Sequence, residues 1–360
     1  MTLFSPLSLG DLQLANRITM APMTRMRSDE NGVPGELVAE YYAQRAGLGL
    51  IVTEGVFPVQ ESKAYAGQPG IETAAQVAGW KTVTDAVHAA GGTVVMQLMH
   101  GGRVTHTDIT GTDRIVGPSA VAIDNDVNTP NGKQPFQVPH ALTLEELETT
   151  KAALIAGAKN AIEAGFDGIE VHSANGYLLH EFLSPASNVR DDQYGGTPAN
   201  RARYVIEVTT AIAEAIGAGR TGIRISPAHN IQDVWERDAD DVRATYEALV
   251  DGISGLGLAY LSVLRADVEG DLIQDLRARF GGKLIANTGF GTVTTREDAT
   301  ALVADGHADA VAVGRLVIAN PDLAERWQAE ADENVPNPSL FYSDGAEGYT
   351  DYPTLESASA

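Results

Sequence analysis

The sequence predicts one α/β domain in which eight parallel strands close into a barrel surrounded by helices, the (β/α)8 or TIM barrel. Short apolar runs alternate with longer segments of helical period, and parallel strands require such crossover segments. The apolar runs number eight, the count that closes this kind of barrel. An open, doubly wound sheet is the alternative, and the lack of a Gly-x-Gly-x-x-Gly motif after the first run argues against it.

The predicted strands are rich in β-branched and other apolar residues, as buried parallel strands are. They span residues 17–23, 48–55, 92–99, 166–172, 221–226, 258–264, 282–289 and 308–315. Side chains at the carboxyl ends of these strands are expected to face the active site of the barrel.

Helix signals fill the intervals between the strands. The clearest helical segments are 36–46, 73–92, 143–165 and 295–306. Glycine ends or follows several of them, as is common at helix C-termini. Thr143 precedes Glu146 by three residues, which is the spacing of a capping box.

Two segments interrupt the alternation. Residues 100–142 are rich in Gly, Pro, Asn and Asp and are too long for a plain connection, so we expect a lid or excursion over the barrel mouth. The last stretch, from residue 334, has no helix or strand period, but its aromatic residues predict that part of it docks on the barrel. We therefore expect one domain over residues 1–355 and a disordered tail at 356–360.

Composition excludes several classes of site and partner. The chain has no cysteine, which excludes disulfides, thiol nucleophiles and iron–sulfur clusters. A formal net charge of −23 disfavours nucleic acid and anionic membranes. The N-terminus lacks the basic start and apolar run of a signal peptide, and no apolar stretch is long enough to span a membrane. We expect a cytoplasmic protein.

Polar side chains occur where the predicted strands end. The first, second, third and fifth strands contribute Thr24, Thr53, Glu54, Gln97, His100, Arg224 and Ser226. A buried Arg224 is costly unless something anionic or polar meets it. The partner is either a carboxylate on another strand, Glu170 or Glu54, or electron-rich atoms of a ligand, and spacing alone leaves both open.

The last two strands end in glycine-rich turns, "ANTGFG" and "VGR". Gly289 and Gly314 let backbone amides approach a phosphate, and Arg315 can bind it in bidentate fashion. TIM barrels often hold phosphate at this place. Ordinary turn glycines are the alternative interpretation.

The stretch "HSANGYLLHEFLSP", residues 172–185, follows the fourth strand. His172 and Asn175 can donate hydrogen bonds to one oxygen, as in an oxyanion hole. Tyr177, with an ordinary pKa of about 10, can deliver a proton. The alternative is that these residues only cap and pack the barrel, which is how we interpret His180. A metal site is not expected, because no set of ligands converges.

These motifs resemble the old yellow enzyme family, the flavin-dependent ene-reductases. The resemblance covers nearly the whole chain. It rests on "LFSPLSLGDLQLANRITMAPMTRMRS", "EYYAQRAGLGLIVTEG", "QLMHGGR", "GFDGIEVHSANGYLLHEFLSPASNVRDDQYGGTPANRARY", "AVAVGRLVIANPDLAERW" and "FYSDGAEGYTDYP".

The resemblance implies that the barrel holds FMN at its mouth. The residues it assigns to the cofactor are Ala21, Pro22, Met23, Thr24, Gly55, Gln97, Arg224, Gly289, Gly314 and Arg315. Thr24 would bond flavin O4, Gln97 the pyrimidine edge, and Arg224 the N1–O2 region. Gly314 and Arg315, with the Gly289 turn, would hold the phosphate.

The resemblance also implies the reaction. Hydride from NADPH or NADH passes through flavin N5 to an activated alkene, such as an α,β-unsaturated carbonyl, a maleimide or a nitroalkene. His172 and Asn175 would bind the activating oxygen, and Tyr177 would protonate the α-carbon. Met99 and Tyr342 would also contact the substrate. The protein would act as a monomer or a homodimer.

The chain departs from many relatives in ways that bear on substrate scope. Met99 replaces a tryptophan, and the loop after the sixth strand, from Arg265, is short. Two rival functions are a non-catalytic flavin-binding protein and a hydrolase that uses Glu54 and Glu170 as its acid and base.

Overall fold

A computed structural model describes residues 1–355 of the chain, and the expected disordered tail at 356–360 lies outside the described residues. Within these residues, eight parallel strands form a closed barrel in the order β10-β11-β12-β13-β14-β3-β4-β5. Their bounds are β3 (Ile18–Met20), β4 (Leu50–Val56), β5 (Val94–Leu98), β10 (Gly168–Ser173), β11 (Thr221–Ile225), β12 (Tyr260–Leu264), β13 (Leu284–Asn287) and β14 (Ala310–Val313). Each strand falls within or overlaps a predicted run, so the barrel prediction is confirmed.

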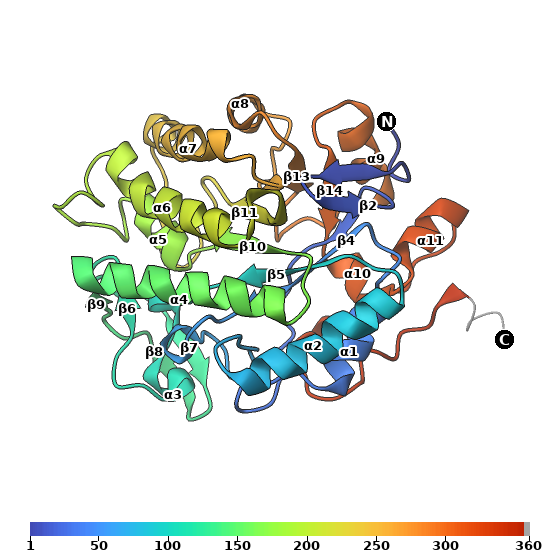
Figure 1. Cartoon of the computed structure of the whole chain (residues 1–360), viewed down its shortest axis with the longest axis horizontal. Coiled ribbons are helices and arrows are strands. Elements are labelled where there is room, and N and C mark those ends of the chain that lie inside the picture. The colour runs from blue at the N-terminus through green and yellow to red at the C-terminus, as the bar shows by residue number, and fades with distance from the viewer. Residues whose placement is uncertain (356–360) are drawn as a thin grey trace.

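Helices surround the strands, as Figure 1 shows. The α-helices outside the excursion are α1 (Glu36–Ala43), α2 (Ala74–Ala89), α4 (Leu144–Glu163), α5 (Leu178–Leu183), α6 (Pro198–Ile216), α7 (Ala239–Ile253), α8 (Asp271–Phe280), α9 (Arg296–Ala304), α10 (Arg315–Ala319) and α11 (Leu323–Ala329). Short 3-10 turns are η1 (Gln60–Ser62), η2 (Gly102–Val104), η3 (Ala218–Arg220), η4 (Ser254–Leu256) and η5 (Pro338–Leu340). The capping box of Thr143 and Glu146 is confirmed. Over residues 1–355 no helix is both long and apolar enough to cross a membrane.

A hairpin of β1 (Leu7–Leu9) and β2 (Leu12–Leu14) closes the amino-terminal end of the barrel. Its four leucines are buried in one cluster with the inward side chains Val52, Val95 and Ile285. The Asp11 amide donates to the carbonyl of Gly219, which precedes β11, and this places the hairpin at the start of the strands. Since this end is plugged by apolar side chains, a ligand can enter only from the carboxyl ends.

The excursion between β5 and α4 has secondary structure of its own. It contains η2, α3 (Thr107–Thr110) and two small sheets, which pair β6 (Val116–Gly117) with β9 (His140–Ala141) and β7 (Asp126–Thr129) with β8 (Gly132–Pro135). Figure 1 shows this group below α4, to one side of the barrel. The sequence pattern indicated its length and irregularity but did not predict the hairpin.

The C-terminal segment docks on α1 and on the turn after β3, as its aromatic residues predict. Tyr349 is fully buried and stacks on Tyr41 with ring centroids 4.0 Å apart. The Arg25 guanidinium donates to the carbonyl oxygens of Phe341 and Gly348 at 3.1 and 3.0 Å. The segment around Tyr342 is thereby tied to the turn that carries Thr24.

Candidate active site

Two hydrogen bonds from backbone amides to side chains fix the turn that follows β10. Asn175 has a left-handed φ of 58° and Gly176 one of 85°, which Asn and Gly adopt more readily than other residues. The Asn175 amide donates to Ser226 Oγ at 2.9 Å, and the Gly176 amide donates to His180 Nδ1 at 3.0 Å. The turn is therefore sharp and braced, and it leaves Tyr177 as the N-cap residue of α5.

His172 and Tyr177 meet across this turn. Their rings contact edge to face, with centroids 5.0 Å apart and planes at 63°. Burial, reinforced by the charge of Arg224, holds the pKa of His172 well below its usual range, so the imidazole is neutral and keeps one N–H donor. Burial raises the pKa of Tyr177 well above 10, so its hydroxyl keeps its proton.

Two buried polar atoms at this turn, His172 Nδ1 and Asn175 Oδ1, have no hydrogen-bond partner within residues 1–355. Leaving such an atom without a partner costs about 1–3 kcal/mol, so native proteins keep few of them. The structure thus brings together His172, Asn175 and Tyr177, the three residues that the sequence singled out. A neutral His172 with its proton on Nδ1 can donate to a ligand oxygen, whereas Asn175 would donate to that oxygen through its amide nitrogen, because its free Oδ1 only accepts.

Arg224 lies on the strand next to His172. The two residues are paired in register between β10 and β11, and Arg224 is paired in turn with Ser262 of β12. Its guanidinium donates to Ser262 Oγ at 3.0 Å and to Asn287 Oδ1 at 3.5 Å, while its buried Nε has no partner among the described residues. No carboxylate of residues 1–355 forms an ion pair with it. The sequence left two partners open for Arg224, a carboxylate or a ligand, and the part of the chain that the structure describes shows no ion pair with a carboxylate.

Gln97 and Glu170 are paired on the adjacent strands β5 and β10. Gln97 Nε2 donates to Glu170 Oε1 at 2.8 Å, and both side chains are buried. Burial raises the pKa of Glu170, against the opposing charge of Arg224. Glu170 therefore orients the amide of Gln97 toward a fixed direction in the barrel mouth.

Glu54 has a different role from Glu170. Its Oε2 accepts hydrogen bonds from the backbone amides of Arg25 and Met26, at 3.0 and 3.2 Å. These two residues directly follow Thr24. Burial raises its pKa to about 7, although both amide bonds oppose the shift. Protein donors thus already engage both carboxylates: Glu54 holds the turn after β3, and Glu170 orients Gln97.

The turn after β3 lies next to the end of β14. The Ala21 amide donates to the carbonyl of Val313 at 2.9 Å. A Cβ added to Gly314 would lie 3.5 Å from Met23 Sδ and 3.9 Å from Ala21 Cβ, so glycine keeps this surface open. The backbone of residues 21–24 and Gly314 thus form one wall of the mouth.

The two glycine-rich turns also meet in space. Arg315 donates to the carbonyl of Phe290, next to Gly289, at 2.6 Å. Gly289 has a φ of 107°, and a Cβ there would have no neighbour closer than 4.0 Å. A cavity of about 350 Å³ opens beside this turn, lined by the loops that follow β11, β12 and β13.

Met99 and Tyr342 both lie near Tyr177. Met99 is buried in an apolar cluster with Ala64, Val104, Ile123 and Tyr177. A Cβ on Gly55 would come within 2.5 Å of Met99 Sδ, so the methionine lies directly against this glycine. Tyr342, from the C-terminal segment, is 64% exposed.

His180 belongs to the packing of α5, as expected from its position. Its Nε2 lies 3.0 Å from the hydroxyl of Tyr246 and 3.3 Å from Glu236 Oε1. Glu236 Oε2 in turn accepts the amide of Ala228 at 2.7 Å. With both ring nitrogens in contact with protein groups, His180 has no free atom for a ligand.

Sequence reasoning missed the neighbours of the site residues. Tyr65 lies with its hydroxyl 2.7 Å from that of Tyr177. Ser262 and Asn287 hold Arg224, and they come from two further strands. Asn287 could have been found as a polar residue at a strand end, but no local signal marks Tyr65, because it lies in a loop far from Tyr177 in the chain.

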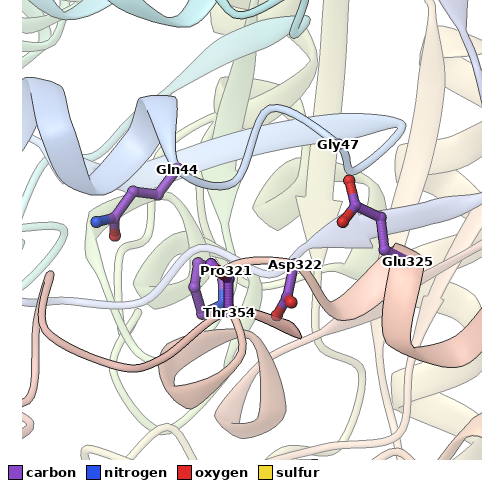
Figure 2. A pocket seen from close by; sticks show the side chains of 6 residues that line it. All are labelled: Gln44, Gly47, Pro321, Asp322, Glu325 and Thr354. Carbon is purple, nitrogen blue, oxygen red and sulfur yellow. The ribbon is translucent and has the colours of Figure 1, made fainter. Parts of the chain in front are cut away.

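A second cavity, of about 230 Å³, lies away from the mouth. It is lined by Gln44, Gly47, Pro321, Asp322, Glu325 and Thr354, as Figure 2 shows. Gly47 precedes β4, so this hollow lies toward the amino-terminal side of the strands. Within residues 1–355 no three His, Cys, Asp or Glu side chains are grouped as metal ligands would be.

The donor set at the mouth fits FMN. A buried guanidinium with a free Nε, an oriented amide, a hydroxyl at Thr24 and an open Gly–Arg corner suit a flavin's electron-rich edge and its phosphate. The site is apolar on one side, at Met99, and polar on the other, as small-molecule sites commonly are.

Comparisons with known proteins agree with this fit. Residues 2–334 match the NADH:flavin oxidoreductase / NADH oxidase family. A probable flavin mononucleotide-dependent alkene reductase of Leishmania infantum is 40% identical over 98% of this chain and 97% of its own length. 12-Oxophytodienoate reductase 1 of Oryza sativa subsp. japonica is 37% identical over 98% of this chain and 93% of its own.

Solved structures show the same fold. The old yellow enzyme homologue from Zymomonas mobilis has a TM-score of 0.93 at 37% identity, over 99% of this chain and 100% of that one. Morphinone reductase has a TM-score of 0.91 at 41% identity, over 100% and 98%. The chain therefore belongs to the NADH:flavin oxidoreductase / NADH oxidase family, the old yellow enzymes, as an FMN-dependent oxidoreductase of the alkene-reductase type that takes hydride from NAD(P)H.

Proposed function

We propose that this protein reduces the C=C bond of activated alkenes, namely α,β-unsaturated carbonyls, maleimides and nitroalkenes, with NADPH or NADH as the reductant. The observation that carries the proposal is the convergence of neutral His172, Asn175 and Tyr177 at one braced turn, with free polar atoms on the first two. This turn lies beside the buried cation Arg224.

Bound FMN supplies a two-electron carrier between NAD(P)H and the alkene. In our proposal Arg224, Gln97 and Thr24 hold the polar edge of the ring. Ala21, Pro22, Met23 and Gly55 line it, and Gly289, Gly314 and Arg315 bind the phosphate. The pairing of Gln97 with Glu170 and of Arg224 with Ser262 supports these roles, because it fixes both donors before the cofactor arrives.

His172 and Asn175 bind the activating oxygen of the alkene. Negative charge gathers on this oxygen as the β-carbon receives hydride, so donors placed there stabilise the transition state more than the ground state. The lowered pKa of His172 supports a neutral N–H donor in this role. Tyr177 then gives its hydroxyl proton to the α-carbon, and its raised pKa ensures that the proton is present beforehand.

The excursion at residues 100–142 is proposed to act as a lid over the substrate side. Val104 and Ile123 of this segment pack in one apolar cluster with Met99 and Tyr177. An alkene bound at Tyr177 would therefore have the excursion on one side and Tyr342 of the C-terminal segment on another. These two segments, with Met99, are expected to set substrate scope.

Anaerobic spectroscopy of the purified holoenzyme tests the function. The protein should be yellow and release FMN on denaturation. NADPH or NADH should bleach the flavin absorbance, and 2-cyclohexenone should restore it. A parallel run with both nucleotides, over a small panel of enones, maleimides and nitroalkenes, would rank donors and substrates.

Two outcomes would contradict the proposal in different ways. A flavin that is bleached but not restored by any alkene of the panel would refute alkene reduction while leaving the NAD(P)H reaction intact. A flavin that neither nucleotide bleaches would point to the non-catalytic flavin-binding alternative.

A further inference from the structure

Tyr65 contacts the hydroxyl from which we propose that the substrate receives its proton. The Tyr65 and Tyr177 oxygens lie 2.7 Å apart, the usual length of a strong O–H···O hydrogen bond. Tyr65 comes from the loop between η1 and α2, and it is remote in sequence from Tyr177. The contact therefore exists only because the loop is folded over the mouth.

The loop that carries Tyr65 is held in place by Gln68. This glutamine is buried, its Oε1 accepts the amide of Ala64 at 2.7 Å, and its Nε2 donates to the carbonyl of Gly55 at 2.8 Å. Ala64 itself is buried in the apolar cluster that contains Tyr177. Tyr65 is thus a fixed partner of Tyr177, tied to the end of β4.

A hydrogen-bond donor beside Tyr177 would stabilise the negative charge that its oxygen acquires during the reaction. When Tyr177 gives up its proton, its oxygen becomes a phenolate in a buried site, which burial disfavours. A hydrogen bond to a charged oxygen is stronger than one to a neutral oxygen, so a neighbouring O–H lowers this cost as the charge develops. If Tyr65 donates to Tyr177, the hydrogen of Tyr177 is also left free to point at the substrate, since each hydroxyl carries one hydrogen.

Tyr65 also lies nearer to solvent than its partner. Tyr177 is 9% exposed, whereas Tyr65 is only partly buried. The exposed Tyr342 lies close enough to act electrostatically on both tyrosines. Of the two tyrosines, Tyr65 is thus the one through which we propose that solvent supplies the proton.

We propose that Tyr65 is a positioning and proton-relay residue that acts through Tyr177. The Tyr177 O–H bond breaks as the Cα–H bond of the product forms. The Tyr65 proton then moves to the Tyr177 oxygen, and a proton from solvent restores Tyr65. The net proton taken up in each turnover thus comes from solvent, and no oxidant or further reductant is needed. This inference rests on the proposed role of Tyr177 as proton donor.

The test is Tyr65→Phe, which keeps the ring and removes the hydroxyl. In anaerobic stopped-flow mixing, reoxidation of the reduced enzyme by 2-cyclohexenone should slow about tenfold, a change of about 1.4 kcal/mol. The solvent deuterium isotope effect on this step should rise, because proton transfer becomes more rate-limiting. Reduction of the flavin by NADPH should be unchanged, since it requires no proton from Tyr177.

The matched control is Tyr194→Phe. It removes one tyrosine hydroxyl, which donates to Glu207 at 3.0 Å in the outer helix layer, and it should leave both half-reactions unchanged. The double variant Tyr65→Phe/Tyr177→Phe should react no more slowly than Tyr177→Phe alone, because Tyr65 acts only through its partner.

Two results would overturn the relay, and they differ from a failure of the proposed function. If Tyr177→Phe is slow but Tyr65→Phe reoxidises at the wild-type rate without a larger isotope effect, Tyr65 has no part in proton delivery. If the two losses multiply in the double variant, Tyr65 acts independently of Tyr177. If Tyr177→Phe itself is unimpaired, the proton donor is another group, and both proposals fall.

Discussion

His172 and His180 belong to one continuous segment, and both are buried, with 4% and 0% of their surface exposed. Their hydrogen-bonding surroundings nevertheless differ completely. The ring nitrogens of His180 contact the Gly176 amide, Tyr246 and Glu236, whereas Nδ1 of His172 has no partner among residues 1–355. Burial is therefore not what distinguishes a binding residue from a packing residue here. The distinction is whether the protein itself satisfies the polar atoms.

The same contrast between ligand-facing and packing residues separates the two halves of residues 172–185. The first half, His172 to Tyr177, ends β10 and faces the mouth, while the second half is α5, whose residues are all buried. Glu181 of α5 shows that an unpartnered atom alone does not make a site. Its Oε2 also has no partner in the described part of the chain, but it lies against Gly102, where even a Cβ would collide with the carboxylate.

The largest expected effect in the first half is that of Tyr177→Phe. Reoxidation of the reduced flavin by 2-cyclohexenone should slow by about 1000-fold, since general acids contribute about 10²–10⁴-fold. Flavin reduction by NADPH should be spared, because the ring still packs on His172. Stopped-flow absorbance separates the two steps, and an unchanged reoxidation rate would assign the proton to water or to another residue.

In the second half, Glu181→Gln should change how stability depends on pH. Burial raises the pKa of Glu181 to about 8. The charge of Arg103 and the hydrogen bond that its backbone amide donates to Glu181 Oε1 at 2.8 Å both oppose this rise. The folded protein thus holds this proton more tightly than the unfolded chain does. The free energy of unfolding should therefore fall as the pH rises from about 4.5 to about 8.

This component should be about 5 kcal/mol, since the pKa of Glu181 is raised from 4.5 to about 8 and one pKa unit corresponds to about 1.4 kcal/mol. The glutamine variant should lack it, so the two proteins should differ in the slope of stability against pH. Urea denaturation at several pH values measures this slope. Parallel curves for the two proteins would mean that Glu181 titrates alike in the folded and unfolded states.

His180→Ala should reduce the free energy of unfolding by about 3 kcal/mol, because it leaves Glu236 and Tyr246 buried with a lost partner. His88→Ala is the matched control. His88 is 38% exposed at its side chain and makes a single contact with Asp167 at 3.1 Å, so its loss should cost less than about 1 kcal/mol. Similar costs for both variants in urea denaturation would remove the distinction between the two halves.

The smallest expected effect is that of His172→Ala on ligand binding. Phenol, titrated by the change in flavin absorbance, should bind about tenfold more weakly, since one hydrogen bond is worth about 0.5–1.5 kcal/mol. FMN content should change little, and the loss of stability should be smaller than that of His180→Ala, because His172 Nδ1 bonds nothing within the described residues and only ring packing is removed. A large loss of stability with unchanged phenol affinity would show that His172, like His180, serves packing and does not bind the ligand.

Much of the fold could be predicted from local signals. Apolar runs of strand length, alternating with helical segments, identified all eight barrel strands, because each strand must bury both faces and each crossover needs a helix. The capping box of Thr143 and Glu146 is equally local and was predicted correctly. The N-terminal hairpin and the small sheets of the excursion were not, because their strands are only two to four residues long and show no clear period.

The sequence by itself determined the barrel and the residues His172, Asn175 and Tyr177 at the exit of its fourth strand, since alternation and strand ends are readable along the chain. Only the tertiary structure decided which groups meet them. Arg224 is held by Ser262 and Asn287 rather than by a carboxylate, Glu54 fastens the turn of Thr24, and Tyr65 reaches Tyr177. Each of these contacts joins residues far apart in the chain, and such distances are set by barrel closure and loop packing, which leave no periodic or local mark in the sequence.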